Sequence, residues 1–201
     1  MAAPGGGRAR PGSVRVRPGR RRLHSARDHR RFEVGRRADH ETIFQTERLR
    51  LEPLRRSHAL VLFDILSDAR LYRFIPKDPP QTLDALAARC ERLETRKSSN
   101  GEEVWLNWAV CLKAEGLYVG RIEATVHPDR SALIAYEIGV TFWGRGFATE
   151  ACGRVIQALF DDYGVERIAA EIDTRNPASI RLVERLDLVR IAVIRRPQEG
   201  R

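Results

Sequence analysis

The sequence predicts a mixed α+β fold in which a central antiparallel meander is followed by two strand–helix–strand passages. Three β-type runs, over 104–113, 117–128 and 132–140, are separated only by short turns. A strand, a helix, a second strand, a second helix and a last strand come after them, up to residue 194. One domain with helices packed on a mixed sheet is therefore expected.

The elements before the meander follow from periodicity and helix-start signals. Alternation predicts a first strand over 46–54, and Ser57 is expected to cap a helix over 58–68. The prolines after residue 75 indicate a loop or short helix over 69–80. Thr82 begins a second helix whose apolar residues form one stripe, namely Leu83, Leu86, Ala87, Cys90 and Leu93.

After the meander, a helix over about 148–163 is expected, with a left-handed stop at Gly164. Its inward face would consist of Ala151, Cys152, Val155, Ile156, Leu159 and Phe160. A strand over 166–174 follows, and Asn176 with Pro177 marks the start of another helix. The last strand is expected over 188–194.

The net charge of +9 arises from one end of the chain. Residues 1–40 contain 12 of the 36 basic residues and three of the 27 acidic ones, so the remainder is balanced at 24 of each. Residues 1–42 are rich in Arg, Gly and Pro and poor in large apolar groups, which predicts a disordered tail before a domain over 43–201. Translated upstream sequence, an organelle transit peptide, and an RNA- or ribosome-binding arm are alternative interpretations of this tail.

The remaining composition favours a cytoplasmic globular protein. Cys90, Cys111 and Cys152 are far apart and have no metal-ligand spacing, so we expect free buried thiols and no metal. No run approaches the roughly 18 apolar residues of a membrane span, and the N-terminus lacks the apolar region of a secretory signal.

The most informative stretch is 133–164, where an apolar strand leads through WGRGFA into a helix. The first N–H groups of a helix have no partner within the helix, and the helix dipole is positive there. A phosphate-bearing ligand is therefore expected over Gly144, Arg145 and Gly146.

Three patches together resemble the GNAT (GCN5-related) N-acetyltransferases, and among them the RimJ/RimL type that acetylates ribosomal-protein N-termini. These patches are TERLRLEPLRRSHA, AYEIGVTFWGRGFATEA and NPASIRLVERLDL, and the resemblance covers roughly residues 44–195. It implies acetyl-CoA as donor, with its diphosphate on the loop after the strand and its pantetheine arm between two splayed strands, 133–141 and 166–174. The residues that would bind acetyl-CoA are Ile138, Val140, Trp143, Gly144, Arg145, Gly146, Phe147, Ala148, Thr149 and Asn176.

Glu137 is the candidate general base. It is the only charged residue in LIAYEIGVTF and shares a strand face with two small residues, Ala135 and Gly139. Burial would raise its pKa toward neutrality, as a base requires. A structural carboxylate that orients a neighbouring arginine is the alternative. Glu123, which alternates with Arg121, is the competing base and is expected to face solvent.

Asn176 and Ser179 match the family pattern Asn-x-x-Ser. The resemblance places Asn176 on the pantetheine arm and Ser179 near the sulfur as a possible proton donor, although plain helix capping by Asn176 is also expected. Many relatives carry a proton-donating tyrosine seven residues after this asparagine, where this chain has Val183.

The amine acceptor is left open by the sequence. A protein N-terminus is favoured by the resemblance, with an aminoglycoside or polyamine as the alternative, and a catalytically weak acyl-CoA-binding module as a third hypothesis. Loop 69–80 and the meander would line its pocket, with Tyr72, Phe74, Trp105 and Trp108 as candidates unless they are core aromatics. The family usually has one more strand pairing with the last one, so we expect an open sheet edge or a homodimer that completes it.

Overall fold

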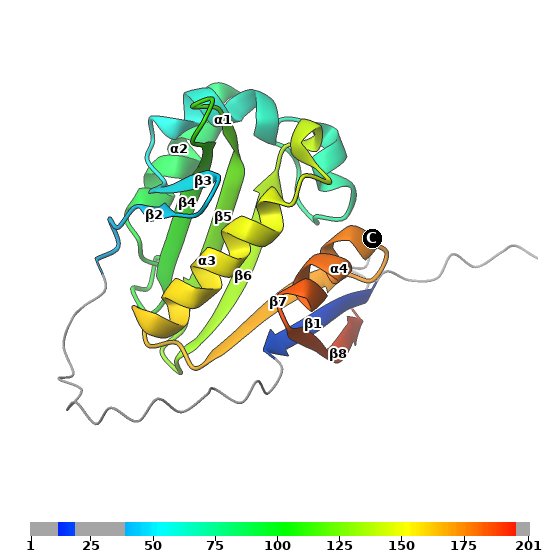
Figure 1. Ribbon diagram of the computed structural model, residues 1–201. Coiled ribbons are helices and arrows are strands. Elements are labelled where there is room, and N and C mark those ends of the chain that lie inside the picture. Colours follow the sequence, from blue (N-terminus) through cyan, green and yellow to red (C-terminus); the bar gives the residue numbers. More distant parts are fainter. Residues whose placement is uncertain (1–11, 19–38, 196–201) are drawn as a thin grey trace, which may run out of the picture.

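The computed structural model describes residues 12–18 and 39–195, which form a mixed sheet with helices on both faces (Figure 1). The strands are β1 (Gly12–Pro18), β2 (Phe44–Gln45), β3 (Leu49–Pro53), β4 (Val104–Leu112), β5 (Tyr118–Val126), β6 (Ser131–Ile138), β7 (Arg167–Asp173) and β8 (Leu188–Arg195). The helices are α1 (His58–Leu66), α2 (Leu83–Glu94), α3 (Phe147–Asp161) and α4 (Pro177–Arg185), with 3₁₀ turns η1 (Ala69–Arg73) and η2 (Val140–Phe142).

The eight strands of the described chain lie in the order β2-β3-β4-β5-β6-β7-β1-β8. Every neighbouring pair is antiparallel except β6 and β7, which are parallel. The predicted meander is confirmed as β4, β5 and β6, because strands joined by short turns pair with their sequence neighbours.

The two faces of the meander carry different chemistry. Trp108, Ile122 and Tyr136 are register neighbours across the three strands and belong to the core beneath α3. One residue along, Arg121 pairs with Glu137 on the opposite face, which α1 and α2 cover. Alternation along each strand thus separates an apolar core from a buried charged pair.

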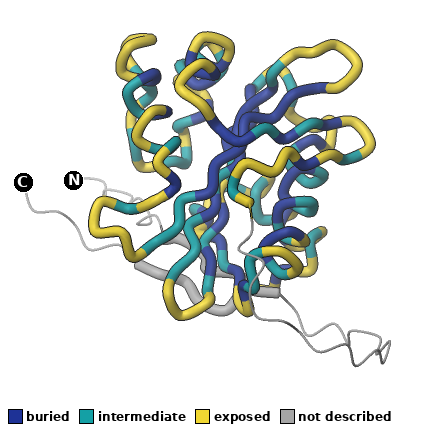
Figure 2. Tube along the Cα trace, turned by 90° about the vertical axis from the view of Figure 1, so that its left-hand side faces the viewer, coloured by how far each residue is buried: buried dark blue, intermediate teal, exposed yellow. Residues whose placement is uncertain are grey.

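Apolar burial holds the two helical layers on the sheet. The inner face of α3 is buried as predicted, through Ala151, Cys152, Val155 and Leu159, while Ile156 and Phe160 are half-buried. On the other face, Leu62 and Leu66 of α1 pack with Leu86 and Cys90 of α2. Each fully buried leucine contributes about 1.5–3 kcal/mol. Figure 2 shows the central strands buried along most of their length, with the exposed residues in the connecting loops.

Strands β6 and β7 separate after a short pairing. They pair over three positions only, from Ser131 with Arg167 to Leu133 with Ala169. Beyond these pairs, the second half of each strand has no partner on the side that faces the other. The splay that the family resemblance implies is therefore present.

The N-terminal strand corrects the expectation of a wholly disordered tail. Residues 12–18 form β1, which pairs antiparallel with β7 on one side and with β8 on the other. Backbone hydrogen bonding to two strands compensates for a sequence poor in large apolar groups. The rest of the predicted tail, 1–11 and 19–38, lies outside the described residues. An open sheet edge or a homodimer was expected where the family has a further strand beside the last one. In the structure β1 pairs with β8 on one side, and β8 is the edge strand of the described sheet.

A bulge lies on β5, next to the end of β6. The register between β4 and β5 shifts at Val110 and Cys111, opposite Tyr118 and Gly120. Gly120 has a φ of +151°, and a Cβ atom there would lie 2.0 Å from the carbonyl oxygen of Glu137. Glycine at 120 therefore allows β6 to approach β5 closely at the position of Glu137.

Two helix starts agree with the sequence prediction, and one predicted cap does not. Thr82 accepts a hydrogen bond from the N–H of Ala85 and Asn176 accepts one from Ser179, so both cap their helices as expected. The Ser57 prediction is wrong, because its side chain forms no capping bond and its backbone is already helical. Gly164 has the expected left-handed conformation, with a φ of +64°.

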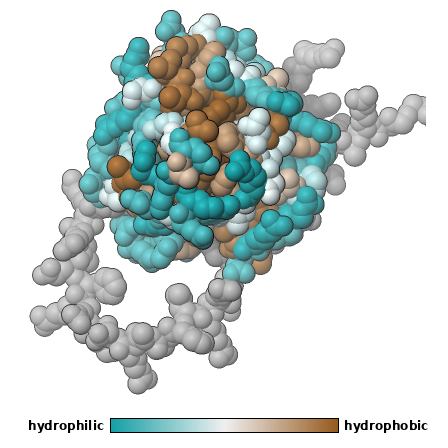
Figure 3. All heavy atoms as spheres, turned by 45° about the horizontal axis from the view of Figure 1, so that its top comes forward, coloured by the Kyte–Doolittle hydropathy of each residue, from teal (hydrophilic) through white to brown (hydrophobic). Residues whose placement is uncertain are grey.

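The surface carries one apolar area of note. Leu60 and Val61 of α1 are exposed, by 73% and 45%. Figure 3, with the upper end of Figure 1 brought forward, shows brown apolar atoms gathered on that face. No helix among the described residues has the length and apolar character needed to cross a bilayer.

Candidate active site

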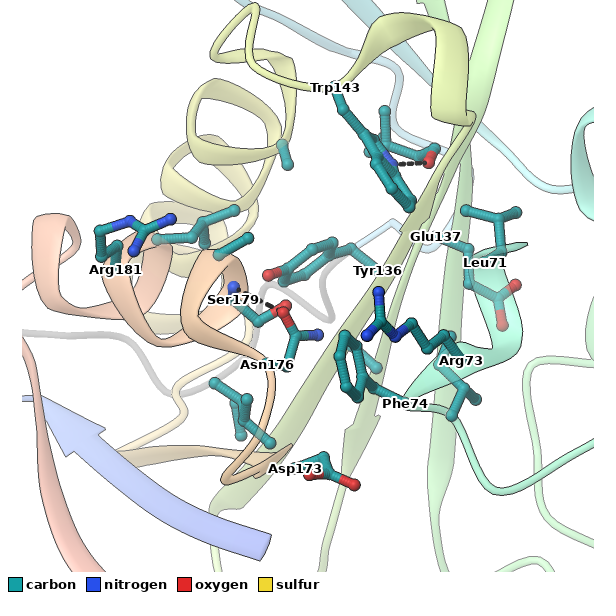
Figure 4. A pocket seen from close by; sticks show the side chains of 18 of the residues that line it. Leu71, Arg73, Phe74, Tyr136, Glu137, Trp143, Asp173, Asn176, Ser179 and Arg181 are labelled. Carbon is teal, nitrogen blue, oxygen red and sulfur yellow. Dashed lines mark hydrogen bonds between the residues drawn. The ribbon is translucent and has the colours of Figure 1, made fainter. Parts of the chain in front are cut away.

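A large cleft opens where β6 and β7 separate. Its volume is about 1060 Å³, and its walls come from the ends of β6 and β7, the amino ends of α3 and α4, and the loop after η1. Figure 4 shows side chains from these elements converging on one space. Of the residues singled out from the sequence, the cleft is lined by Glu137, Ile138, Trp143, Gly144, Gly146, Phe147, Ala148, Thr149, Asn176 and Ser179.

The amino end of α3 faces this cleft without a side-chain cap. Its N-cap residue, Gly146, has a φ of +81° and provides no capping bond. A Cβ atom at Gly144 would meet nothing within 4 Å, so the loop leaves space above the helix start. The Trp143 indole nitrogen donates a 2.7 Å hydrogen bond to the carbonyl of Ile138, which fastens the loop to the end of β6. The first-turn N–H groups are thus presented to an anion.

Two residues predicted to bind acetyl-CoA do not line the cleft. Val140 lies in η2 and packs against the core between the sheet and α1 and α2. The Arg145 guanidinium lies 4.8 Å from the centre of the Phe147 ring. The main-chain carbonyl of Arg145 accepts a hydrogen bond from the Arg48 side chain. Because the Arg145 side chain stacks on an aromatic ring, this loop lines the cleft through its glycines and main chain and not through the arginine.

Glu137 is held by two cations. Its carboxylate lies 2.6 Å from Arg121 Nε and 2.5 Å from Lys77 Nζ, and the Glu137 and Arg121 side chains are 5% and 3% exposed. Burial alone would raise the pKa of Glu137, but the charges of Arg121 and Lys77 and their hydrogen bonds lower it to about 2.

The expectation of a raised pKa at Glu137 is therefore wrong, and the alternative of a structural carboxylate fits the geometry. A carboxylate with a pKa near 2 accepts a proton poorly at neutral pH. Glu123, which was expected to face solvent, has a side chain 34% exposed and lies 2.7 Å from Arg121, which is itself buried between Glu123 and Glu137. Those carboxylates raise the pKa of Arg121 in spite of its burial.

The opposite wall of the cleft carries three polar side chains. Asn176 caps α4 through the N–H of Ser179, at 3.1 Å. Figure 4 shows the hydroxyl of Tyr136 pointing across the cleft toward Ser179 and Asn176, while the Glu137 carboxylate lies on the other side of β6. Successive residues of β6 therefore bring two different groups to the cleft: the Tyr136 phenol from one face of the strand and the ion-paired Glu137 from the other.

Among the four aromatic candidates for an acceptor pocket, only Phe74 lines the cleft. Trp108 is 1% exposed in the core, which confirms the core interpretation for it. The hydroxyl of Tyr72 donates to the carbonyl of Leu66, and Trp105 donates to Glu103 away from the cleft. Arg73 lies 5.1 Å from the Phe74 ring, at the mouth.

A family model described as "Acetyltransferase (GNAT) domain" matches residues 48–189. The chain belongs to the GNAT acetyltransferase family. It is accordingly an acetyl-CoA-dependent N-acetyltransferase, and the mixed α+β fold predicted from the sequence is that of the family.

Individual relatives agree with this assignment. The chain is 26% identical over 155 residues to the uncharacterized N-acetyltransferase YoaA of Bacillus subtilis, covering 76% of this chain and 86% of that protein. The ribosomal-protein-S5-alanine acetyltransferase of Vibrio fischeri superposes with a TM-score of 0.63 at 20% identity, over 74% and 83% of the two chains. Mycobacterium smegmatis RimJ, in complex with CoA-disulfide, gives 0.58 at 20% identity over 68% of each chain.

The cleft of this acetyltransferase has the chemistry that acetyl-CoA requires. A diphosphate needs several N–H donors in a positive field, and the uncapped start of α3 has them. A thin flexible arm needs a slot, and the divergence of β6 from β7 makes one. Within the described residues, no group of three or more His, Cys, Asp and Glu side chains is placed to hold a metal ion.

Lys77, Arg121 and Tyr136 were not among the site residues predicted from the sequence. Lys77 lies in a proline-rich loop whose path the sequence does not determine, and Arg121 entered the prediction only as the charged neighbour of Glu123. Tyr136 carried one usable signal, since it is the only hydroxyl-bearing side chain in LIAYEIGV.

Proposed function

We propose that this acetyltransferase acts on the α-amine at the N-terminus of a protein. The observation that supports this acceptor is the state of Glu137, whose carboxylate is neutralised by Arg121 and Lys77. Because this buried carboxylate is paired with two cations, it accepts a proton poorly and cannot serve as a strong base. Such a cleft favours an acceptor amine that is already partly neutral.

Amine classes differ sharply in this respect. An α-amine has a pKa near 7.7–8.0, so about a tenth of it is neutral at pH 7. A lysine-like amine has a pKa near 10.4, and roughly one molecule in 2,500 is neutral at that pH. A cleft without a strong base therefore favours the α-amine, because only the neutral amine is a nucleophile.

The charges at the mouth support the same choice. Arg73, the last residue of η1, lines one side of the cleft beside Phe74, whereas Lys77, in the loop after η1, is paired with Glu137. Positive charge there disfavours polyamines and aminoglycosides, which carry several cations. Two structural neighbours, from Vibrio fischeri and Vibrio cholerae, are named as acetyltransferases of ribosomal proteins, but at 20% and 17% identity that likeness concerns the fold alone.

In this proposal, acetyl-CoA supplies a thioester carbonyl for attack by the amine. The N–H groups of Phe147, Ala148 and Thr149 hold its diphosphate, and the slot between β6 and β7 aligns its arm. Main-chain N–H groups at the end of β6, near Ile138, stabilise the oxyanion. Glu137 keeps Arg121 and Lys77 in place, and the proton lost by nitrogen passes to solvent through the open cleft.

A small polycationic amine is the second candidate. Glu123, Glu137, Glu171 and Asp173 all line the cleft, and carboxylates attract ammonium groups. Three of them already lie against arginines: Glu137 and Glu123 against Arg121, and Asp173 against Arg175.

The test is acetyl transfer from acetyl-CoA to matched acceptors, followed by product mass. The panel contains a peptide with a free N-terminus and no lysine, the same peptide with a blocked N-terminus and one internal lysine, spermidine, and an aminoglycoside. We expect transfer to the first peptide only, with kcat/KM rising as pH approaches the amine pKa. Preferred transfer to spermidine or the aminoglycoside would exclude the protein α-amine as the main acceptor.

A further inference from the structure

Tyr136 lines the cleft but has no assigned part in the acetyl transfer described above. Its ring packs against the core beneath α3, with Ile122 beside it in the sheet. Its hydroxyl is buried and has no hydrogen-bond partner among the described residues. Burial raises the pKa of Tyr136 and the nearby Ser179 hydroxyl acts against that rise, although the two hydroxyls do not form a hydrogen bond.

A buried hydroxyl without a partner costs stability, whereas phenylalanine would pack the same ring without that cost. The hydroxyl does not lie in a closed core, because Tyr136 lines the cleft and points toward Ser179 at the start of α4 (Figure 4). A destabilising polar group directed into a reaction cleft is expected where a ligand supplies its partner.

We propose that Tyr136 is a catalytic residue that donates a proton to the sulfur of coenzyme A as the acetyl group leaves. The inference rests on the acetyl transfer described above. It concerns the donor side of that reaction, across β6 from Glu137. Tyr136 and Ser179 flank the same end of the slot from two elements, β6 and α4.

The step balances without another reactant. The amine nitrogen forms a bond to the carbonyl carbon, and the carbon–sulfur bond breaks with its electron pair on sulfur. The Tyr136 hydroxyl gives its proton to that sulfur, so the free thiol departs. The proton lost by the nitrogen passes to solvent through the open cleft, and the phenolate regains a proton from that solvent, with the Ser179 hydroxyl placed to pass it on.

Burial suits Tyr136 to this role. It raises the pKa of the phenol, so the hydroxyl remains protonated at neutral pH, as a donor must be. The same desolvation makes a thiolate in the slot more basic and more ready to accept the proton.

The experiment compares Tyr136→Phe with Tyr118→Phe in the full chain. The Tyr118 hydroxyl donates a 2.9 Å hydrogen bond to Glu52 and does not line the cleft. Three quantities are measured for each protein: the Tm without ligand, the Kd for coenzyme A, and kcat for acetyl transfer to hydroxylamine. Hydroxylamine is small enough that the assay does not depend on the natural acceptor.

For Tyr136→Phe we expect an unchanged or higher Tm, a Kd within about twofold of wild type, and a kcat lower by about 100-fold or more. Tyr118→Phe should show the opposite pattern, with a lower Tm and an unchanged kcat. A Tyr136→Phe protein with wild-type kcat, or with a Tm lowered as in Tyr118→Phe, would show that the hydroxyl is structural and overturn the proposal.

The outcome separates the two proposals. If the wild-type protein acetylates hydroxylamine but no peptide N-terminus, the proposed acceptor is wrong while the test of Tyr136 stands. If the wild-type protein transfers acetyl to neither, both proposals fail.

Discussion

Strands β2 to β6 and strands β7, β1 and β8 form two parts of one sheet, and they differ in how far apart along the chain neighbouring strands lie. In the first part, β3 pairs with β4, β4 with β5 and β5 with β6. In the second, β7 and β8 are not adjacent, because a strand from the other end of the chain lies between them. Local pairing is visible in a sequence pattern, and distant pairing is not.

The cleft lies at the junction of these two parts, and the register there explains its shape. β6 pairs with β7 only up to Ala169, and β1 pairs with β7 from Ala170 to Asp173 on the other side. Residues 170–173 form one wall of the cleft. The part of β7 that has left β6 is therefore held by β1, so the N-terminal strand supports this wall of the cleft. Four variants test this comparison.

The largest effect is expected from Val14→Pro. Val14 pairs with Ile172 of β7 and with Val193 of β8, and proline inside a sheet removes a donor and disrupts the ladder. We expect the affinity for coenzyme A to fall at least tenfold, measured by calorimetry. Amide hydrogen exchange should accelerate in β7 and β8 and stay slow in β4 and β5.

Deletion of residues 1–11, which leaves β1 in place, is the matched control and should change neither quantity. Wild-type binding by Val14→Pro would show that β1 is dispensable and would restore the view of residues 1–42 as a tail outside the domain.

The second variant, Glu137→Gln, acts within the locally paired part. It leaves the buried Arg121 with Glu123 as its one remaining carboxylate partner among the described residues, and breaking such a buried pair costs about 3 kcal/mol of unfolding free energy. Because the folded-state pKa, about 2, lies below the ordinary 4.5, the carboxylate stabilises the fold above about pH 4.5 and loses that effect as pH falls toward 2. Urea unfolding at pH 7, 5 and 3 should show the gap between variant and wild type closing. A gap that is the same at all three pH values would contradict an ionised, paired Glu137.

Gly146→Ala tests the junction itself. A non-glycine residue at a φ of +81° costs about 1–2 kcal/mol, and the strain falls on the loop that presents the N–H groups of α3. We expect the Kd for coenzyme A to rise roughly tenfold, since 1.4 kcal/mol corresponds to that factor. Gly116→Ala is the control, because Gly116 has a φ of +67° with nothing within 4 Å of a Cβ atom and lies in the turn between β4 and β5. Equal losses of affinity in both variants would mean that the strain acts through general stability.

The smallest effect is expected from Thr82→Ala. Thr82 caps α2 through a 3.1 Å hydrogen bond from Ala85, and losing such a cap costs about 1 kcal/mol. Thermal unfolding should detect this cost, while coenzyme A binding should be unchanged because α2 does not line the cleft. A weaker affinity would show that the face under α1 and α2 is coupled to the slot.

Much of the site could be predicted from the sequence, because its determinants are close together in the chain. WGRGFA places two glycines between a strand and a helix, and both have positive φ in the structure. Asn176 with Pro177 begins α4, which brings Ser179 to the cleft. What failed depended on partners distant in sequence. The pKa of Glu137 depends on Arg121 of another strand and Lys77 of a loop, and a carboxylate surrounded by apolar residues in the sequence gave no sign of either.

The sequence by itself determined the meander, the glycine turn before α3 and the family, since each depends on residues within about one element and its neighbour. Only the tertiary structure decided that residues 12–18 complete the sheet, that Glu137 is ion-paired, and that the Tyr136 hydroxyl points toward Ser179. These features arise from register and burial between segments far apart in the chain. Hydrophobic periodicity reports which face of an element is buried, but not which distant group will lie against it.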